Sequence, residues 1–137
     1  MFLPRKRGRM KRILFVILAV ILILSIYVSG CGINMETVLA PIEDLHIWAD
    51  NSSPEQYFVD VASGEPDSCY EYSGYDVTRY ENKVRVEILN IHYIRDGCAE
   101  IYSIVEHTIP IGSDYLPGVN YTVEVNDVAE TFIPPIL

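Results

Sequence analysis

Tyrosines gather among carboxylates in one short part of the chain, residues 69–80. Aromatic faces beside acidic groups bind amines by cation–π attraction or stack on sugar rings, and tyrosine is frequent in protein interfaces. Tyrosine is also a good strand residue, because cross-strand aromatic pairs stabilise sheets. We therefore predict a binding surface here, with a purely structural role as the alternative. The residues are Tyr70, Tyr72, Tyr75 and Tyr80.

Catalytic residue types are present, but none follows a known pattern. The chain has no Gly-x-Ser-x-Gly turn around a nucleophile and no glycine loop that would cradle a phosphate. His46 and His107 fall within strand-like runs, and His92 ends another, which is typical of ordinary sheet residues. We expect no enzymatic activity.

Metal-binding patterns are equally weak. Cys69 and Cys98 could join the histidines in a metal site, but no Cys-x-x-Cys spacing supports this. Oxygen ligands for calcium occur near the C-terminus, without the dense spacing of an EF-hand loop. We expect neither a metal nor another cofactor. The oxygen ligands considered are Asp114, Glu124, Asn126, Asp127 and Glu130.

Charge is divided sharply along the 137 residues. Six of the ten Lys and Arg lie in the first 12 residues, whereas all 19 Asp and Glu follow residue 35. The remaining four cations cannot form the clustered positive surface that phosphate contacts require, so nucleic-acid binding is not expected. A surface this acidic could attract cationic partners.

An apolar run, residues 13–28, follows the basic start and spans about 24 Å as a helix. A membrane span needs about 20 residues, so a signal peptide fits better. The next residues, Val28-Ser29-Gly30-Cys31, resemble the lipobox of bacterial lipoproteins. The resemblance implies cleavage before Cys31, lipidation of its thiol with a diacylglyceryl group and palmitate, and attachment to the extracytoplasmic side of a membrane. A plain secretory signal or an uncleaved anchor are the alternatives.

The domain boundaries follow from this resemblance. We expect a signal peptide at residues 1–30, a short tether at 31–42 and one folded domain at 43–134. Met10 also precedes a complete, shorter signal peptide, which favours it as the true start. Gly32 after the lipidated cysteine resembles sorting to an outer membrane, if the cell has one.

Cys69 and Cys98 form an even pair in a chain expected to be exported. Such a pair indicates a disulfide. The bond would close a loop of about 30 residues, worth roughly 3 to 4 kcal/mol in the chain-entropy model.

From residue 43 onward the pattern alternates with period two and shows no helical stripe. In residues 83–92, Val84, Val86 and Ile88 share one face, and Lys83, Arg85 and Glu87 share the other. About seven strands with frequent turns predict an all-β, antiparallel, immunoglobulin-like sandwich. The expected strands are 44–49, 56–63, 74–80, 83–92, 100–108, 119–126 and 128–133.

Residues 116–125, Leu-Pro-Gly-Val-Asn-Tyr-Thr-Val-Glu-Val, resemble the corner before strand F of fibronectin-III-like and other immunoglobulin-like domains. The resemblance implies a tyrosine corner in which Tyr121 bonds to the backbone near Leu116. It implies a fold and no particular function.

Together these patterns predict a lipid-anchored protein of the cell envelope with a non-catalytic binding or adaptor domain. The expected partners are the membrane, through the N-terminal lipid, and an envelope protein, a glycan or a cationic ligand. A small extracytoplasmic enzyme or inhibitor, or a structural accessory that recognises nothing small, are the alternatives.

Overall fold

The computed structural model describes residues 12–21 and 32–136. The chain divides into two units, Met1–Ile33 and Asn34–Leu137. In the first unit the described residues 12–21 are helical, and no helix in the described ranges is long and apolar enough to cross a bilayer. The lipobox and Cys31 lie outside the described residues, so their roles stay predictions.

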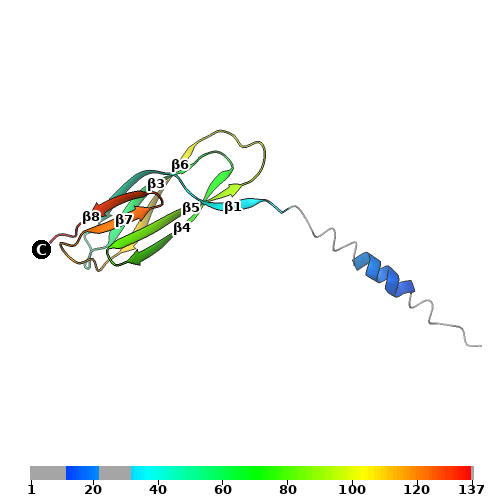
Figure 1. The fold of residues 1–137 in the computed structure, drawn as a ribbon, viewed down its shortest axis with the longest axis horizontal. Coiled ribbons are helices and arrows are strands. Elements are labelled where there is room, and N and C mark those ends of the chain that lie inside the picture. Colours follow the sequence, from blue (N-terminus) through cyan, green and yellow to red (C-terminus); the bar gives the residue numbers. More distant parts are fainter. Residues whose placement is uncertain (1–11, 22–31, 137) are drawn as a thin grey trace, which may run out of the picture. The chain divides into compact units, whose positions relative to one another are not determined.

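The second unit is a β-sandwich, which confirms the predicted fold class (Figure 1). We call the two layers sheet A and sheet B. Sheet A contains β1 (Met35–Leu39), β4 (Tyr70–Tyr80), β5 (Lys83–Tyr93), β7 (Tyr121–Val125) and β8 (Val128–Phe132). Sheet B contains β2 (Ile42–Ala49), β3 (Tyr57–Glu65) and β6 (Ser103–Gly112), in the order β2-β3-β6.

Alternating apolar residues build the core between the sheets, because successive side chains of a strand point to opposite faces. The faces predicted for β5 are the ones observed: Val84, Val86 and Ile88 are fully buried. Val59 and Val61 of β3 meet them from sheet B, and both are buried. The sheets therefore hold together through branched aliphatic side chains on their inner faces.

One strand pair departs from the predicted antiparallel arrangement. β5 and β7 are parallel, with Lys83 beside Thr122 and Val86 beside Val125. The chain leaves β5 for β6 in the other sheet and returns to sheet A, so β7 starts at the same end as β5. The sheet is consequently mixed, and the sandwich has eight strands instead of seven.

The tether expected at residues 31–42 is wrong over most of its length. Residues 35–39 form β1, which pairs antiparallel with β5 from Met35 beside Tyr93 to Leu39 beside Leu89. Ala40 then bonds to Ile88 of sheet A, and the Pro41 carbonyl bonds to Gly64 of sheet B. β1 was missed because four of its five residues are exposed, so it lacks the alternation that marks a half-buried strand.

Two local features expected from the sequence are present. Cys69 and Cys98 are joined in a disulfide, with their Cα atoms 5.5 Å apart. The hydroxyl of Tyr121 accepts a hydrogen bond from the Leu116 N–H at 3.0 Å. They tie down opposite ends of the sandwich, since the disulfide lies beyond the end of β5 and Leu116 lies near its start.

Candidate functional site

The four tyrosines proposed as a binding surface do not form one surface. Tyr70 stacks on His92 and Tyr72 lies against His107, with ring centres 4.2 and 4.1 Å apart. These two rings are half-buried, and Tyr72 packs against the core. Both rings pack on histidines of neighbouring strands or of the other sheet, which favours the structural role given as the alternative.

The other two tyrosines are exposed but separated by the sheet. Tyr75 lies beside Ile88, on the inward side, whereas Tyr80 lies beside Lys83 on the outward side. Their side chains are 42% and 71% exposed. The four tyrosines therefore do not all share one face, and the binding surface stays a prediction. Because of the irregularity between Tyr72 and Gly74, Tyr75 lies on the same inward side as Tyr70 and Tyr72. Tyr80 alone among the four lies on the outward side.

A serine–histidine pair that the sequence did not reveal lies between the sheets. Ser63 Oγ and His107 Nε2 are 2.9 Å apart, and Tyr72 covers the imidazole. Ser63 is 1% exposed, so a substrate has no route to its hydroxyl. Burial lowers the pKa of His107, and the nearby Glu65 carboxylate opposes this in part. The pair satisfies two polar groups of the interior and offers no accessible nucleophile.

The most distinctive surface is the outer face of sheet B. Strand register aligns its residues in rows that run across β2, β3 and β6. The polar row is His46, Asp60 and Thr108; the acidic row is Asp44, Ala62 and Glu106. We call these six residues the acidic face.

The acidic face is hollowed. A pocket of about 420 Å³ is lined by its six residues together with Val61 and His107. Ala62, the smallest side chain of its row, stands between Asp44 and Glu106 and leaves room between the two carboxylates. A ligand placed there would contact carboxylates from three strands.

Aromatic side chains lie at both ends of this hollow. The row next to Asp60 is apolar, and its Trp48 and Phe58 rings stack at 4.6 Å. Beyond Ala62, Tyr102 lies so close over Gly64 that a Cβ there would come within 1.9 Å of the tyrosine hydroxyl. That hydroxyl donates to Glu43, a bond that raises the pKa of Tyr102 and keeps it protonated. A side chain at position 64 would therefore require the Tyr102 ring to move.

No Lys or Arg on the strands of sheet B neutralises the carboxylates of the acidic face. The three strands of sheet B carry five carboxylates and no Lys or Arg. Among the described residues the Asp60 carboxylate accepts one side-chain hydrogen bond, from the Thr108 hydroxyl at 2.7 Å. The negative charge of this face is therefore available to a ligand.

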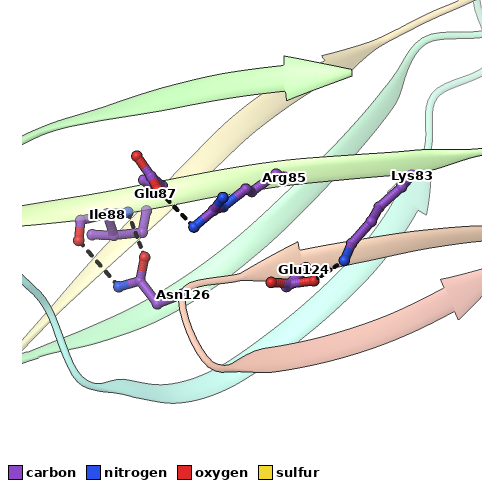
Figure 2. A network of polar contacts seen from close by, with 6 residues as sticks. All are labelled: Lys83, Arg85, Glu87, Ile88, Glu124 and Asn126. Carbon is purple, nitrogen blue, oxygen red and sulfur yellow. Dashed lines mark hydrogen bonds and ion pairs between the residues drawn. The ribbon is translucent and has the colours of Figure 1, made fainter. Parts of the chain in front are cut away.

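The four Lys and Arg that follow residue 34 are engaged elsewhere. On the outer face of sheet A, Lys83 pairs with Glu124, and Arg85 pairs with Glu87 at 3.1 Å (Figure 2). The Arg79 guanidinium donates to the Ser113 carbonyl at 2.7 Å, and Arg95 donates to the Ser68 carbonyl at 3.4 Å. Lys83 and Arg85 thus lie beside carboxylates on sheet A, whereas the strands of sheet B carry carboxylates without Lys or Arg.

Metal binding gains little support from the described residues. The group whose ligand atoms converge is Asp67, Cys69 and Cys98, but both sulfurs belong to the disulfide and cannot act as thiolate ligands. The calcium ligands considered from the sequence are occupied in part: Glu124 pairs with Lys83, and the Asn126 side chain bonds to Ala40 and Ile88.

Sequence reasoning missed the acidic face for a definable reason. Alternation shows that Asp60 points away from Val59 and Val61, but it does not show which residues of other strands lie beside it. The absence of Lys and Arg from residues 42–49, 57–65 and 103–112 was a usable signal. It identifies a surface once these three segments are known to form one sheet.

Comparison with known proteins gives one match. The sequence model of the family described as ORF11 beta-sandwich domain matches residues 59–133, from within β3 to the end of β8. No curated protein and no solved structure matches the chain. The matched segment contains Asp60, Glu106 and Thr108 of the acidic face, while β2 with Asp44 and His46 precedes it.

Proposed function

The chain belongs to the ORF11 β-sandwich domain family, and from this premise we propose that it is a lipid-anchored envelope protein whose acidic face binds a cationic ligand. The domain acts as a binding module and carries out no reaction. The observation that carries the proposal is the hollow on sheet B, where carboxylates stand between aromatic side chains on strands that contain no Lys or Arg.

The geometry favours a ligand with more than one positive charge. Asp44 and Glu106 flank Ala62 on strands two apart in the sheet, and neighbouring strands are spaced by about 4.8 Å. The Cα atoms of Asp44 and Glu106 therefore lie roughly 10 Å apart, so that each carboxylate can pair with one end of an extended diamine. Asp60, in the adjoining row, belongs to β3, the strand between the two that carry Asp44 and Glu106.

The aromatic ends of the hollow suit the same ligand class. Trp48 presents an exposed ring face next to the polar row, and ammonium groups are attracted to such faces. The methylene segments of a polyamine can also pack on Phe58 and Tyr102. Apolar contact and charge thus favour an amine with an aliphatic chain.

Trp48 makes binding measurable, because it is the single tryptophan of the chain. We expect spermidine to change its fluorescence when added to the full chain in neutral detergent at low salt. The paired substitutions Asp44→Asn and Glu106→Gln should weaken spermidine binding by at least tenfold, about 1.4 kcal/mol. Raising the salt concentration should weaken it as well.

A matched control separates this site from general acidity. Glu71→Gln with Asp76→Asn removes the same charge from exposed positions of β4 and should change the affinity less than twofold. Equal weakening by both pairs of substitutions, or none by the Asp44 and Glu106 pair, would refute a site on the acidic face.

The lipid anchor is tested separately by metabolic labelling with an alkyne-bearing palmitate. Support for it comes from the sequence: the basic start, the apolar run and the lipobox before Cys31. We expect the label in the native chain and its complete loss in Cys31→Ser. The double substitution Cys69→Ser and Cys98→Ser should keep the label, which identifies Cys31 as the acceptor.

A further inference from the structure

We infer that the domain stands end-on, with the disulfide end of the sandwich against the lipid bilayer and Met35, Ile94 and Ile101 at headgroup level. This inference rests on the lipidation of Cys31 proposed above. It adds the orientation of the domain and the surface that touches the membrane.

The first argument is the reach of the chain. Three residues, Gly32, Ile33 and Asn34, separate Cys31 from the first residue of β1. Four steps of extended chain cover at most about 14 Å. The headgroup layer of one leaflet is roughly 5 to 8 Å thick. A lipid on Cys31 therefore keeps Met35 within or just above the headgroups.

The second argument is that the start of β1 is locked to one end of the domain. Ile94 N–H donates to the Asn34 carbonyl at 2.8 Å, and five residues of β1 pair with β5. The Tyr93 N–H donates to the Cys69 carbonyl, also at 2.8 Å. The domain cannot move away from the membrane without breaking the pairing of β1 with β5.

The loop between β5 and β6 belongs to the same end (Figure 1). Its Ala99 carbonyl accepts from the Ser68 N–H at 3.0 Å, and the Cys69–Cys98 disulfide joins it to the corner before β4. The start of β1, this loop and the corner therefore form one firm surface, which we call the disulfide end.

The third argument is the character of the side chains there. Met35, Ile94 and Ile101 are 60%, 54% and 63% exposed. Isolated exposed apolar residues are common, but these three lie at the end that the tether brings to the membrane. Carboxylates of Asp96 and Glu100 share the end, so the lipid supplies the attraction and the apolar side chains set the orientation.

The opposite end is too far away to touch the same bilayer. β5 has 11 residues and is about 33 Å long at roughly 3.3 Å per residue. The Leu116 N–H donates to the Tyr121 hydroxyl, and the next residue, Thr122, lies beside Lys83. Leu116 is therefore near the start of β5. Leu116 is 65% exposed and offers a position matched to Ile101 in exposure.

Tryptophan quenching by brominated lipid tests the orientation. The lipidated full chain carrying Trp48→Phe receives either Ile101→Trp or Leu116→Trp and is placed in vesicles of brominated phosphatidylcholine. We expect at least threefold stronger quenching of the residue at 101 than of that at 116. Inserting ten Gly and Ser residues between Ile33 and Asn34 should abolish the difference.

Equal quenching at the two positions, or stronger quenching at 116, would overturn the end-on orientation. If a tryptophan variant does not fold, hydrogen exchange of the native lipidated chain replaces it: residues 94–102 should exchange at least threefold more slowly on vesicles than in detergent. Unchanged exchange there would also overturn it. Palmitate labelling of the same samples distinguishes the two proposals. An unlabelled chain refutes the anchor as well as the orientation. A labelled chain without the difference in quenching refutes the orientation alone.

Discussion

The side chain of Asn126 makes backbone-like hydrogen bonds to both polar groups of Ile88 (Figure 2). Its Oδ1 accepts from the Ile88 N–H at 2.9 Å, and its Nδ2 donates to the Ile88 carbonyl at 3.1 Å. Nδ2 also donates to the Ala40 carbonyl at 2.6 Å. Asn126 thereby bridges the gap along the edge of β5 between the end of β1, at Leu89, and the end of β7, at Val86.

Replacing Asn126 by Asp should cost about 2 to 3 kcal/mol of unfolding free energy, because two carbonyls lose a donor and face a carboxylate. Urea unfolding followed by circular dichroism measures this. Asp127→Asn at the neighbouring exposed position is the control and should stay within about 0.5 kcal/mol of the native chain. A similar small effect for Asn126→Asp would show that the junction does not need this side chain.

Tyr121→Phe should lower the unfolding free energy by about 1 to 2 kcal/mol, since the Leu116 N–H then loses its partner. The phenylalanine ring keeps its contacts with Tyr115 and Phe132, so packing is preserved. Tyr80→Phe, at an exposed ring, should have no measurable effect in the same denaturation experiment. Equal stability of all three chains would remove the tyrosine corner as a stabilising element.

Opening the disulfide should destabilise the domain by roughly 3 to 4 kcal/mol, because a loop of about 30 residues gains freedom in the unfolded chain. Thermal unfolding with and without a phosphine reductant measures the effect. The double substitution Cys69→Ser and Cys98→Ser should reproduce it and abolish any further response to reductant. A reductant effect that persists in this variant would have to come from elsewhere in the chain.

The half-buried imidazole of His107 should make stability depend on pH. Burial lowers its pKa below the ordinary 6.5, so near and below pH 6.5 the unfolded chain binds more protons than the native one. Stability should therefore fall as the pH drops below 6.5 and level off below the native pKa. Urea unfolding between pH 8 and pH 5 measures the slope.

His107→Gln should flatten this pH dependence, whatever it does to the stability at pH 8. A slope that persists in the His107 variant would assign the pH dependence to other groups.

The sequence predicted the segments that depend on local alternation. The expected strands at 83–92 and 128–133 lie within a residue or so of β5 and β8, because their apolar residues recur with period two. The expected strand at 74–80 is shorter than β4, which begins at Tyr70. The structure accommodates Ser73 as an irregularity within β4, between Tyr72 and Gly74.

Alternation predicted which residues of β5 turn inward, and setting Cys31 aside for the lipobox left Cys69 and Cys98 as the pair to be cross-linked. Both inferences depend on local residue patterns. Only the tertiary structure decided that Met35–Leu39 is a strand, that β7 runs parallel to β5, and that Asp44, Ala62 and Glu106 form one row. Each of these depends on which distant segment supplies the hydrogen bonds and in what register. That choice is set by how the two sheets pack, and no local pattern contains it.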